Sequence, residues 1–252
     1  MANRSSPMLT PGNRLLSALP PDEFLRLQKH LEPVALRKDQ VLVHPGDEIH
    51  HGYFPLDGIL SVLMILEDST PVEVANIGNE GFADSASILS IATSPYEIVA
   101  QGPGHALRIS VQALRQEFRE SLGLRELLLR FCGVLLTCTG RSLACKVTHT
   151  PEQRLAKWLL LARDRTIGDE LPYTQEALAR MLGVRRPTVS EAAEALKERG
   201  LIEYHRGLIQ VMDRAGLEQA ACTDYQAFID EYERLLGPAP AHGRANKVRP
   251  TE

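Results

Sequence analysis

The chain has 252 residues, 44% of them hydrophobic and 24% charged, and a formal net charge of −4 at pH 7. These values are typical of a globular protein of one or two domains, and they exclude a fibrous or largely disordered chain. The net charge does not indicate nucleic-acid binding, but it does not exclude it either, because DNA binding requires only a local basic surface.

The N-terminal part predicts a tail followed by two short helices. Residues 1–12 are polar and lack an apolar core, so they predict a disordered tail and not a signal peptide. Residues 13–31 have leucines at helical spacing, and Pro20-Pro21 divides this segment into two helices. No apolar run reaches the roughly 20 residues that a membrane span needs. We therefore expect a cytoplasmic protein without membrane contact.

Residues 34–109 predict a series of short antiparallel strands. Apolar runs in this part are brief and end at turn-forming residues such as Gly46, Asp57-Gly58 and Gly78. A later run, residues 99–109, is interrupted by Gly102-Pro103-Gly104. Strands at this spacing predict an antiparallel sandwich or barrel.

Helical spacing returns at Val111, and one pattern within it predicts a dimerisation helix. Apolar or small residues alternate at spacings of four and three over about three heptads, as in a coiled-coil seam. Gly133 and Gly140 lie in this run and can let a partner helix approach closely. Packing of the helix on its own domain stays open as an alternative. The predicted seam consists of Leu124, Leu128, Phe131, Leu135, Cys138, Ser142 and Cys145.

A new helix is predicted to begin at residues 149–153. Thr150 suits the N-cap, Pro151 suits the first helical position, and Gln153 completes a capping box. We therefore place a domain boundary near residues 146–150.

Residues 173–200 carry the most specific motif, a helix-turn-helix. Ala179 is small where a second helix would cross the first, and Gly183 supplies the freedom for a short turn. The second helix, residues 187–199, would present its first turn to the major groove of DNA. Two short strands flanking Arg206-Gly207 follow and predict a β-hairpin wing. A helical hairpin used only for packing is the alternative, but it explains neither the wing nor Arg185-Arg186.

This order of elements resembles the Crp/Fnr family of bacterial regulators over residues 13–225, and residues 171–190 resemble its DNA-reading motif. The resemblance implies an α+β fold, in which an N-terminal antiparallel β-roll of the jelly-roll type with flanking helices precedes a long dimerisation helix and a C-terminal winged helix-turn-helix. It also implies a homodimer on palindromic double-stranded DNA, with RNA polymerase as a further candidate partner. In the β-domain the match is looser and rests on strand order and on Gly46, Gly58, Gly78 and Gly81.

The second helix of the motif matches the family's DNA-reading residues at only some positions. Arg186 falls where many members have a base-reading arginine, and Ser190 matches the serine of the Fnr-like branch. Pro187 and Glu191 depart from the usual glutamate and arginine, so we expect an operator that differs from either branch's consensus. Arg186 can pair with guanine, and Glu191 can accept from a cytosine amino group. The predicted DNA-binding residues are Thr174, Gln175, Arg185, Arg186, Thr188, Ser190, Glu191, His205 and Arg206.

The resemblance also implies an effector pocket in the β-roll. Members that bind a cyclic nucleotide hold its phosphate with an arginine, but Ser94-Pro95 occupy the corresponding stretch here. We therefore expect no control by cyclic AMP, and a pocket that takes a neutral or apolar ligand or is filled by its own side chains. The N-terminal cysteine cluster of iron–sulfur members is missing from this sequence, so we do not expect that cofactor. The candidate pocket residues are Gly81, Phe82, Asp84, Tyr96 and Arg141.

The four cysteines are Cys132, Cys138, Cys145 and Cys222, and none of them forms a CxxC pair. This spacing argues against a disulfide framework and a zinc knuckle, so we expect reduced thiols and no metal site. Cys138 and Cys145 are one heptad apart in the predicted seam, where each would face its own copy in a parallel dimer. Cross-linking on oxidation and burial as small hydrophobic residues both stay open.

No catalytic motif is visible, so we do not expect an enzyme. The sequence predicts a DNA-binding transcription regulator that is modulated by an unidentified effector. Two alternatives stay open: a regulator that needs no effector, and a ligand-sensing regulatory subunit that acts through protein contacts. The predicted domains are a tail (1–12), a sensor β-roll (13–116), a dimerisation helix with a hinge (117–149), a winged helix-turn-helix (150–225), and the end of a C-terminal helix with a disordered tail (226–252).

Overall fold

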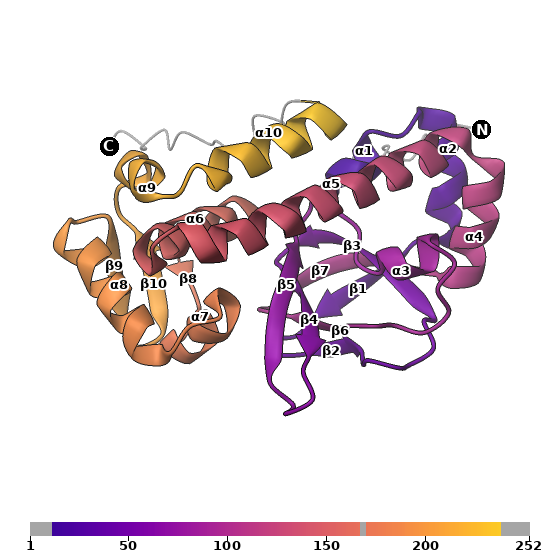
Figure 1. The fold of residues 1–252 in the computed structure, drawn as a ribbon. Helices are drawn as coiled ribbons and strands as arrows, with labels where there is room; N and C mark the ends of the chain where they lie inside the picture. The colour runs from indigo at the N-terminus through magenta and orange to yellow at the C-terminus, as the bar shows by residue number, and fades with distance from the viewer. Residues whose placement is uncertain (1–11, 167–169, 238–252) are drawn as a thin grey trace. The chain divides into compact units, whose positions relative to one another are not determined.

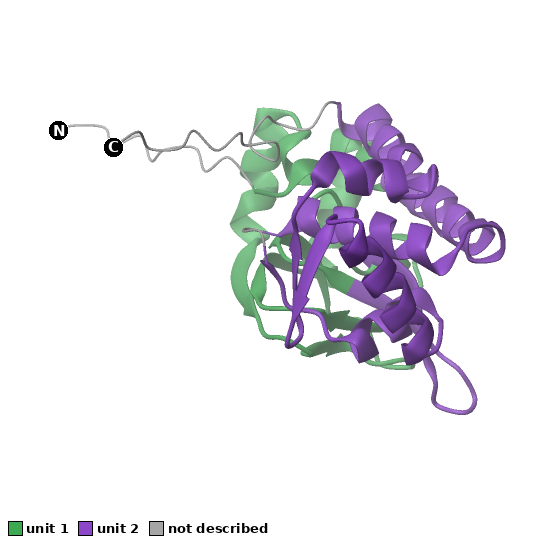
Figure 2. Cartoon of the chain, turned by 90° about the vertical axis from the view of Figure 1, so that its left-hand side faces the viewer, with its two compact units in different colours: residues 1–60, 77–128 green, residues 61–76, 129–252 purple. Residues whose placement is uncertain are grey.

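The computed structural model describes residues 12–166 and 170–237, so most of the two predicted tails lies outside the described residues. The chain divides into two compact units, residues 1–60 with 77–128 and residues 61–76 with 129–252 (Figure 2). The division falls inside the long helix α5 (Leu122–Thr148), not after residue 116 or residue 149, where the sequence places its boundaries (Figure 1).

Antiparallel strands form the framework of the first unit, as the short apolar runs predict. They are β1 (Glu32–Leu36), β2 (Val41–Val43), β3 (His51–Asp57), β6 (Glu97–Ala100) and β7 (Gly104–Ser110). β7 lies between β1 and β3 in a three-stranded sheet, in which Phe54 is opposite Leu107. β2 pairs with β6. The predicted interruption at residues 102–104 separates β6 from β7.

Short helices flank these strands: α1 (Arg14–Ser17), α2 (Pro21–Leu27), the 3-10 turn η1 (Gln28–His30), α3 (Ser85–Ile88) and α4 (Val111–Glu120). The prolines separate α1 from α2, as expected. Buried Asn13 caps α1 by accepting from the backbone N–H of Leu16, and its amide donates to the carbonyl oxygens of Pro55 and Gly81, each at 2.9 Å. These bonds connect the helix to the strands, because a buried amide must find partners inside the protein.

α5 begins at an acidic cap supplied by α2. The carboxylate of Glu23 accepts from the backbone N–H groups of Gly123 at 3.3 Å and Leu124 at 3.1 Å, and from the hydroxyl of Ser121. A carboxylate at a helix N-terminus satisfies unpaired N–H groups and is favoured by the helix dipole.

The second unit contains most of the hairpin β4 (Leu60–Ile65) to β5 (Pro71–Ile77), and the C-terminal helices and strands. These are α6 (Pro151–Arg165), β8 (Glu170–Leu171), α7 (Gln175–Leu182), α8 (Arg186–Glu198), β9 (Ile202–His205), β10 (Leu208–Val211), α9 (Arg214–Ala220) and α10 (Asp224–Leu236). β10 lies between β8 and β9 in a small antiparallel sheet.

Helix α6 is the central helix of the second unit. The predicted capping box is present, since Thr150 Oγ1 accepts from the Gln153 N–H at 3.3 Å and Gln153 Oε1 accepts from the Thr150 N–H at 3.0 Å. Residues 154–162 are all buried, and Leu155 and Leu159 are 0% exposed. Each fully buried leucine stabilises the fold by about 1.5–3 kcal/mol, so α6 supports the helices packed on it.

Candidate nucleic-acid interface

The helix-turn-helix forms as the sequence predicts. Thr174 Oγ1 caps α7 by accepting from the backbone N–H of Ala177 at 3.2 Å. Gly183 ends the helix with φ +62, a left-handed conformation that glycine adopts without strain. The N–H of Val184 then donates to the carbonyl of Ala179 at 3.1 Å, which closes the turn before α8.

One buried arginine that the sequence reading missed supports this turn. Arg154 on α6 is only 7% exposed, and its guanidinium donates to the carbonyl oxygen of Leu182 at the end of α7. A buried guanidinium requires such a partner, because burying an unpaired charge is costly. No local sequence signal indicates this role, because it depends on the burial of Arg154 and on the end of α7 lying beside it.

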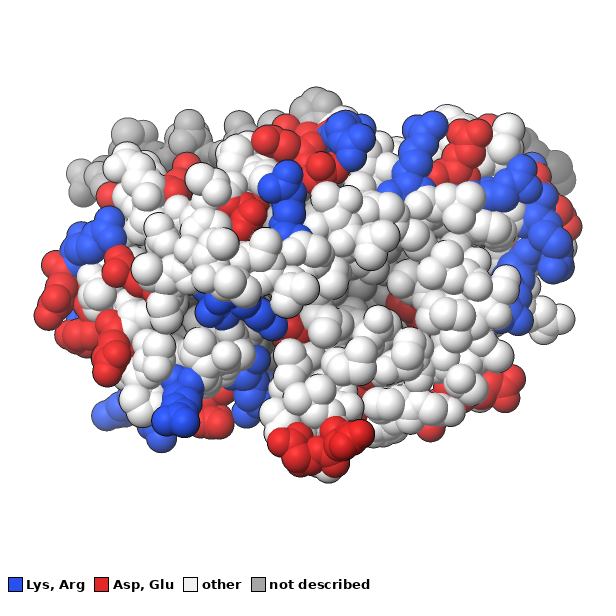
Figure 3. Space-filling model, viewed as in Figure 1, with Lys and Arg blue, Asp and Glu red and all other residues white. Residues whose placement is uncertain are grey.

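The first turn of α8 presents two exposed cations. Arg185 and Arg186 are exposed, as are Pro187 and Glu191, whereas Thr188 is half-buried. Among the described residues, neither arginine forms an ion pair within 4.0 Å. Lys and Arg side chains gather at the lower end of the α7–α8 region (Figure 3). A helix N-terminus carries partial positive charge as well, so this surface is suited to a polyanion.

Two predicted contact residues bind one another in the structure. Ser190 Oγ donates to Gln175 Oε1 at 2.7 Å, and it also lies 3.2 Å from the carbonyl oxygen of Arg186. Both side chains are half-buried. Their hydrogen bond joins the first turn of α7 to the second turn of α8.

The wing is a tight hairpin between β9 and β10. Arg206 and Gly207 have φ +47 and +83, which matches a two-residue turn of the primed type that suits twisted strands. His205 and Arg206 are exposed, and His205 lies 3.4 Å from Glu203. A Cβ on Gly207 would lie 3.4 Å from the methyl group of Thr174, so the structure brings the wing tip and the start of α7 together.

The predicted dimer seam lies on the face of α5 that is buried within the chain. Exposure is 4% or less for its members Leu124, Leu128, Phe131, Cys138 and Cys145, while Leu135 and Ser142 are half-buried. This corrects the expectation that the seam faces a second copy, and that Cys138 and Cys145 face their own counterparts. Burial within the single chain accounts for this face, and the alternative of packing on the helix's own domain stays a prediction.

A second apolar stripe on α5 is exposed. It contains Leu129, Leu136, Leu143 and Val147, which are 47, 76, 67 and 83% exposed. Gly133 and Gly140 are also exposed, and a Cβ on either would meet no atom within 4 Å. At 3.6 residues per turn, this stripe lies nearly opposite the buried face. Both faces have the same alternation of four and three residues, so the sequence pattern does not show which of them is exposed.

Helix α5 is also the one helix among the described residues that is long and apolar enough to cross a membrane by length and composition. The sequence reading did not expect such a helix. Its two apolar faces explain the composition, since one is buried within the chain and the other repeats at coiled-coil spacing.

The candidate effector residues do not form one open pocket. Phe82 is 0% exposed, its ring lies 4.6 Å from that of Phe54, and a Cβ on Gly52 would come within 2.2 Å of it. Gly81 is buried and Tyr96 is half-buried. Arg141 belongs to the second unit, where its guanidinium lies 3.7 Å from Asp224.

Asp84 differs from the other candidate effector residues because its carboxylate is buried without a hydrogen-bond donor among the described residues. It is 4% exposed, its φ is +89, and neither carboxylate oxygen accepts a hydrogen bond among the described residues. Burial raises the pKa of this carboxyl to about 6. At neutral pH, Asp84 therefore places a negative charge inside the first unit.

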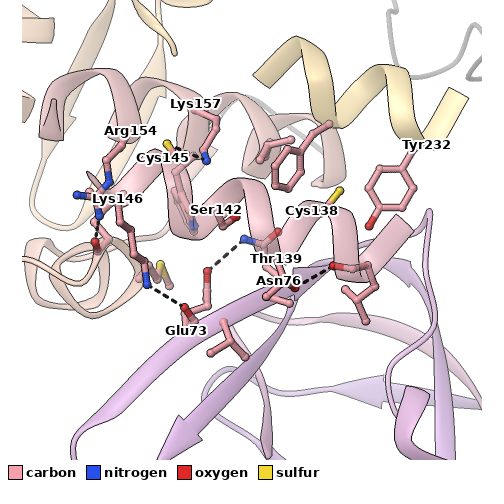
Figure 4. Close-up of a pocket in the computed structure, with 18 residues that line it drawn as sticks. Glu73, Asn76, Cys138, Thr139, Ser142, Cys145, Lys146, Arg154, Lys157 and Tyr232 are labelled. Carbon is pink, nitrogen blue, oxygen red and sulfur yellow. Dashed lines mark hydrogen bonds between the residues drawn. The ribbon is translucent and has the colours of Figure 1, made fainter. Parts of the chain in front are cut away.

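The cavities of the two units are small. One of about 130 Å³ in the first unit is lined by β2, β3 and the segment between them, and includes none of the predicted effector residues. One of about 60 Å³ in the second unit is lined by residues of β5, α5, α6, α7 and α10, among them Glu73, Lys146 and Lys157 (Figure 4). Pockets for drug-sized ligands are usually about 300–1,000 Å³, so neither cavity is a preformed nucleotide site.

Comparison with known proteins finds relatives among regulators. The chain is 25% identical over 183 residues to the global nitrogen regulator of Nostoc sp. strain PCC 7120, covering 69% of this chain and 82% of that protein. Its fold is similar to that of FixK2 from Bradyrhizobium japonicum, with a TM-score of 0.60, 14% identity and coverage of 77% of this chain and 98% of that chain. The c-di-GMP-responsive global regulator CLP of Xanthomonas campestris gives a TM-score of 0.59, 18% identity and coverage of 76% and 99%.

Two family models match separate parts of the chain and together cover more than half of it. The cyclic nucleotide-binding domain matches residues 33–121, and the Crp-like helix-turn-helix domain matches residues 153–220. Both assignments agree with the strands of the first unit and with the α7–α8 motif and wing. The chain belongs to the Crp/Fnr family of DNA-binding transcription regulators.

Proposed function

We propose that this regulator binds a two-fold symmetric operator as a homodimer, with the first turn of α8 in the major groove. The observation that carries the proposal is the exposed pair Arg185 and Arg186 at the start of a capped reading helix, beside an exposed wing. A helical hairpin used only for packing would bury this surface or pair its charges.

Individual contacts follow from position and chemistry. Arg186 can donate two hydrogen bonds to a guanine edge, and Glu191 can accept from cytosine. Arg185 and the wing residues His205 and Arg206 can hold phosphates, which gives affinity without sequence preference, and Thr188 can touch a base or a phosphate. Thr174 and Gln175 at the N-terminus of α7 can also approach phosphate.

We propose that the exposed stripe of α5 forms the dimer interface. Leu129, Gly133, Leu136, Gly140, Leu143 and Val147 alternate at spacings of four and three. The two glycines are not required by contacts within the chain, since a Cβ there would meet nothing within 4 Å. They would let a second α5 approach closely, and burying the large side chains would contribute about 1.5–3 kcal/mol each. A two-fold dimer would place two α8 helices about one DNA turn, ~34 Å, apart.

A second question is whether DNA binding by this regulator requires an effector. The position of Phe82, which fills the space beside Gly52, favours the second candidate function, a regulator whose DNA binding needs no effector. In either case we propose that the protein acts in the cytoplasm, where RNA polymerase is a candidate partner.

Selection of bound sequences from random DNA with the purified chain, followed by footprinting, tests the proposal. We expect an inverted repeat whose half-sites are about one helical turn apart, with both half-sites protected at saturation. Enrichment of a single half-site with one-sided protection would contradict the dimer, and absence of any enrichment would favour a regulatory subunit that acts through protein contacts.

A further inference from the structure

Four side chains that can each bind a metal ion meet inside the second unit. Cys145 lies in the last turn of α5 and His149 directly follows this helix, and Cys222 and Asp224 come from the junction of α9 and α10. One donor atom from each residue lies within 4.8 Å of the other three, and both cysteines and Asp224 are buried. The sequence predicts no metal site, because none of its four cysteines forms a CxxC pair. Cys145 and Cys222 are 77 residues apart, and the fold brings them together.

The backbone holds both pairs of donors in place. Cys145 and His149 are four residues apart, and the His149 N–H donates to the Cys145 carbonyl at 3.1 Å, so the last helical turn puts both side chains on one face. The N–H of Cys222 donates to the Gln153 carbonyl at 3.3 Å, which fixes the second pair against the start of α6.

Three of the six separations between the donor atoms are close to those of a tetrahedral ion. Zinc bonds of about 2.3 Å to sulfur and about 2.0–2.2 Å to nitrogen and oxygen give tetrahedron edges of about 3.8 Å between sulfurs and about 3.4 Å between nitrogen and oxygen. Here the Cys145 and Cys222 sulfurs are 3.5 Å apart, and His149 Nδ1 lies 3.5 Å from Asp224 Oδ2. The Cys222 sulfur lies 4.0 Å from the same oxygen. The three remaining separations are each within 4.8 Å, so the four donors surround a space that one ion could fill after they move inward.

Two cations lie beside the cluster and fit its charge. Arg141 lies 3.7 Å from Asp224 Oδ1, which leaves Oδ2 directed toward the sulfur and imidazole donors. Buried Lys157 donates to the Cys145 sulfur at 3.4 Å (Figure 4). Among the described residues, no carboxylate lies within ion-pair distance of Lys157. Two thiolates, a carboxylate and a divalent cation carry a net charge of about −1, which would give the buried ammonium a counter-charge.

We propose that Cys145, His149, Cys222 and Asp224 form a binding site for one thiophilic divalent cation of the zinc type. Two sulfurs, one imidazole nitrogen and one carboxylate oxygen in a tetrahedral arrangement favour zinc over calcium or magnesium, which prefer six or more oxygen ligands. Binding would release the two thiol protons to solvent. The bound ion would fasten the end of α5 to the α9–α10 junction, across the start of α6. This proposal does not depend on DNA binding.

Metal titration of the reduced, chelator-stripped full chain tests the site. We expect Co²⁺ to bind at one equivalent per chain, with the visible bands of tetrahedral cobalt and a near-ultraviolet thiolate-to-cobalt band, and Zn²⁺ to displace it. Cys145→Ser and Cys222→Ser should each weaken the thiolate band and the metal affinity. Arg141→Ala should weaken affinity by about 10- to 100-fold, as expected for a group that orients a ligand.

Two variants keep the test independent of folding defects. His149→Ala removes a ligand that is only half-buried and lies beyond the last residue of α5, so it should fold and still lose metal affinity. Cys132→Ser makes the same change as the ligand variants on the same helix, outside the cluster, and should bind like the parent chain. Absence of saturable Co²⁺ or Zn²⁺ binding in the reduced chain would overturn the proposal. Equal binding by the His149→Ala, Cys145→Ser and parent chains would do the same.

Discussion

The hydroxyl of Ser190 donates to the side-chain oxygen of Gln175 at 2.7 Å, and this bond joins the second turn of the reading helix α8 to the first turn of α7. Ser190 therefore supports the angle between the two helices, and base contact by its hydroxyl would require this bond to be exchanged.

Ser190→Ala and Gln175→Ala should show coupled effects on stability. A neutral hydrogen bond of this kind contributes about 0.5–1.5 kcal/mol net, so the double variant should cost less than the sum of the single variants by about that amount. Chemical unfolding of the four chains measures the coupling. If Ser190 reads a base instead, Ser190→Ala would change the selected operator while the two substitutions stay additive.

Arg186→Ala should weaken binding to the selected operator by about 1–3 kcal/mol and relax the preference at one base pair of each half-site. Arg206→Ala should instead weaken binding to all sequences and reduce the salt dependence, because we propose that the wing holds phosphate. Affinity measured over a range of salt concentrations separates the two effects. Arg119→Ala, at an exposed position of α4, is the matched control. An unchanged selected sequence for Arg186→Ala would rule out its base-reading role.

Leu136→Glu combined with Leu143→Glu should convert the dimer to monomers, because the partner helix would bury two unpaired carboxylates. Both side chains are more than two-thirds exposed in the single chain, so folding should be little affected. Thr137→Glu adds the same charge to an exposed neighbour about 100° around the helix and should leave the dimer intact. Sedimentation equilibrium gives the oligomeric state, and a stable dimer of the double variant would exclude this stripe as the interface.

Asp84→Asn should stabilise the protein at neutral pH. Burial raises the pKa of Asp84 from its usual 3.8 to about 6, so between these pH values the folded state holds a proton that the unfolded state has lost. The contribution of this group to the free energy of unfolding therefore falls as pH rises to about 6 and stays low above it. The gain on substitution should be near zero at pH 4 and at most about 3 kcal/mol at pH 7.

Thermal unfolding of the parent and variant chains across this pH range measures that gain. Asp39→Asn is the control, since Asp39 also has a positive φ but is exposed, and it should show little effect. A gain for Asp84→Asn that is constant from pH 4 to pH 7 would show that its cause is not the ionisation of this carboxyl.

Cyclic AMP should not bind the protein at micromolar concentrations. Buried Asp84 would oppose the phosphate charge, and the ring of Phe82 fills space within the first unit. Family members that bind the nucleotide pair its phosphate with arginine, a strong charge-assisted contact. Calorimetric titration with cyclic AMP and cyclic GMP measures this, and saturable binding tighter than about 10 μM, or roughly 7 kcal/mol, would refute the expectation.

Features that depend on a few neighbouring residues could be predicted from the sequence. The capping box of Thr150 and Gln153, the left-handed turn at Gly183 and the wing turn at Arg206-Gly207 are set by local hydrogen bonds and allowed backbone angles. Such signals, together with the strand and helix periodicities, predict the antiparallel strands and the α7–α8 motif, and the resemblance to the Crp/Fnr family adds the fold class.

Only the tertiary structure decided which surfaces are buried and which distant residues meet. Both faces of α5 carry the same apolar alternation, so the sequence could not tell the face that packs within the chain from the exposed face of Leu136 and Leu143. Likewise, Cys145 and Cys222 are brought to 3.5 Å by the packing around α6, not by any local spacing. Periodicity describes a single element, whereas burial and the meeting of side chains depend on how all the elements pack.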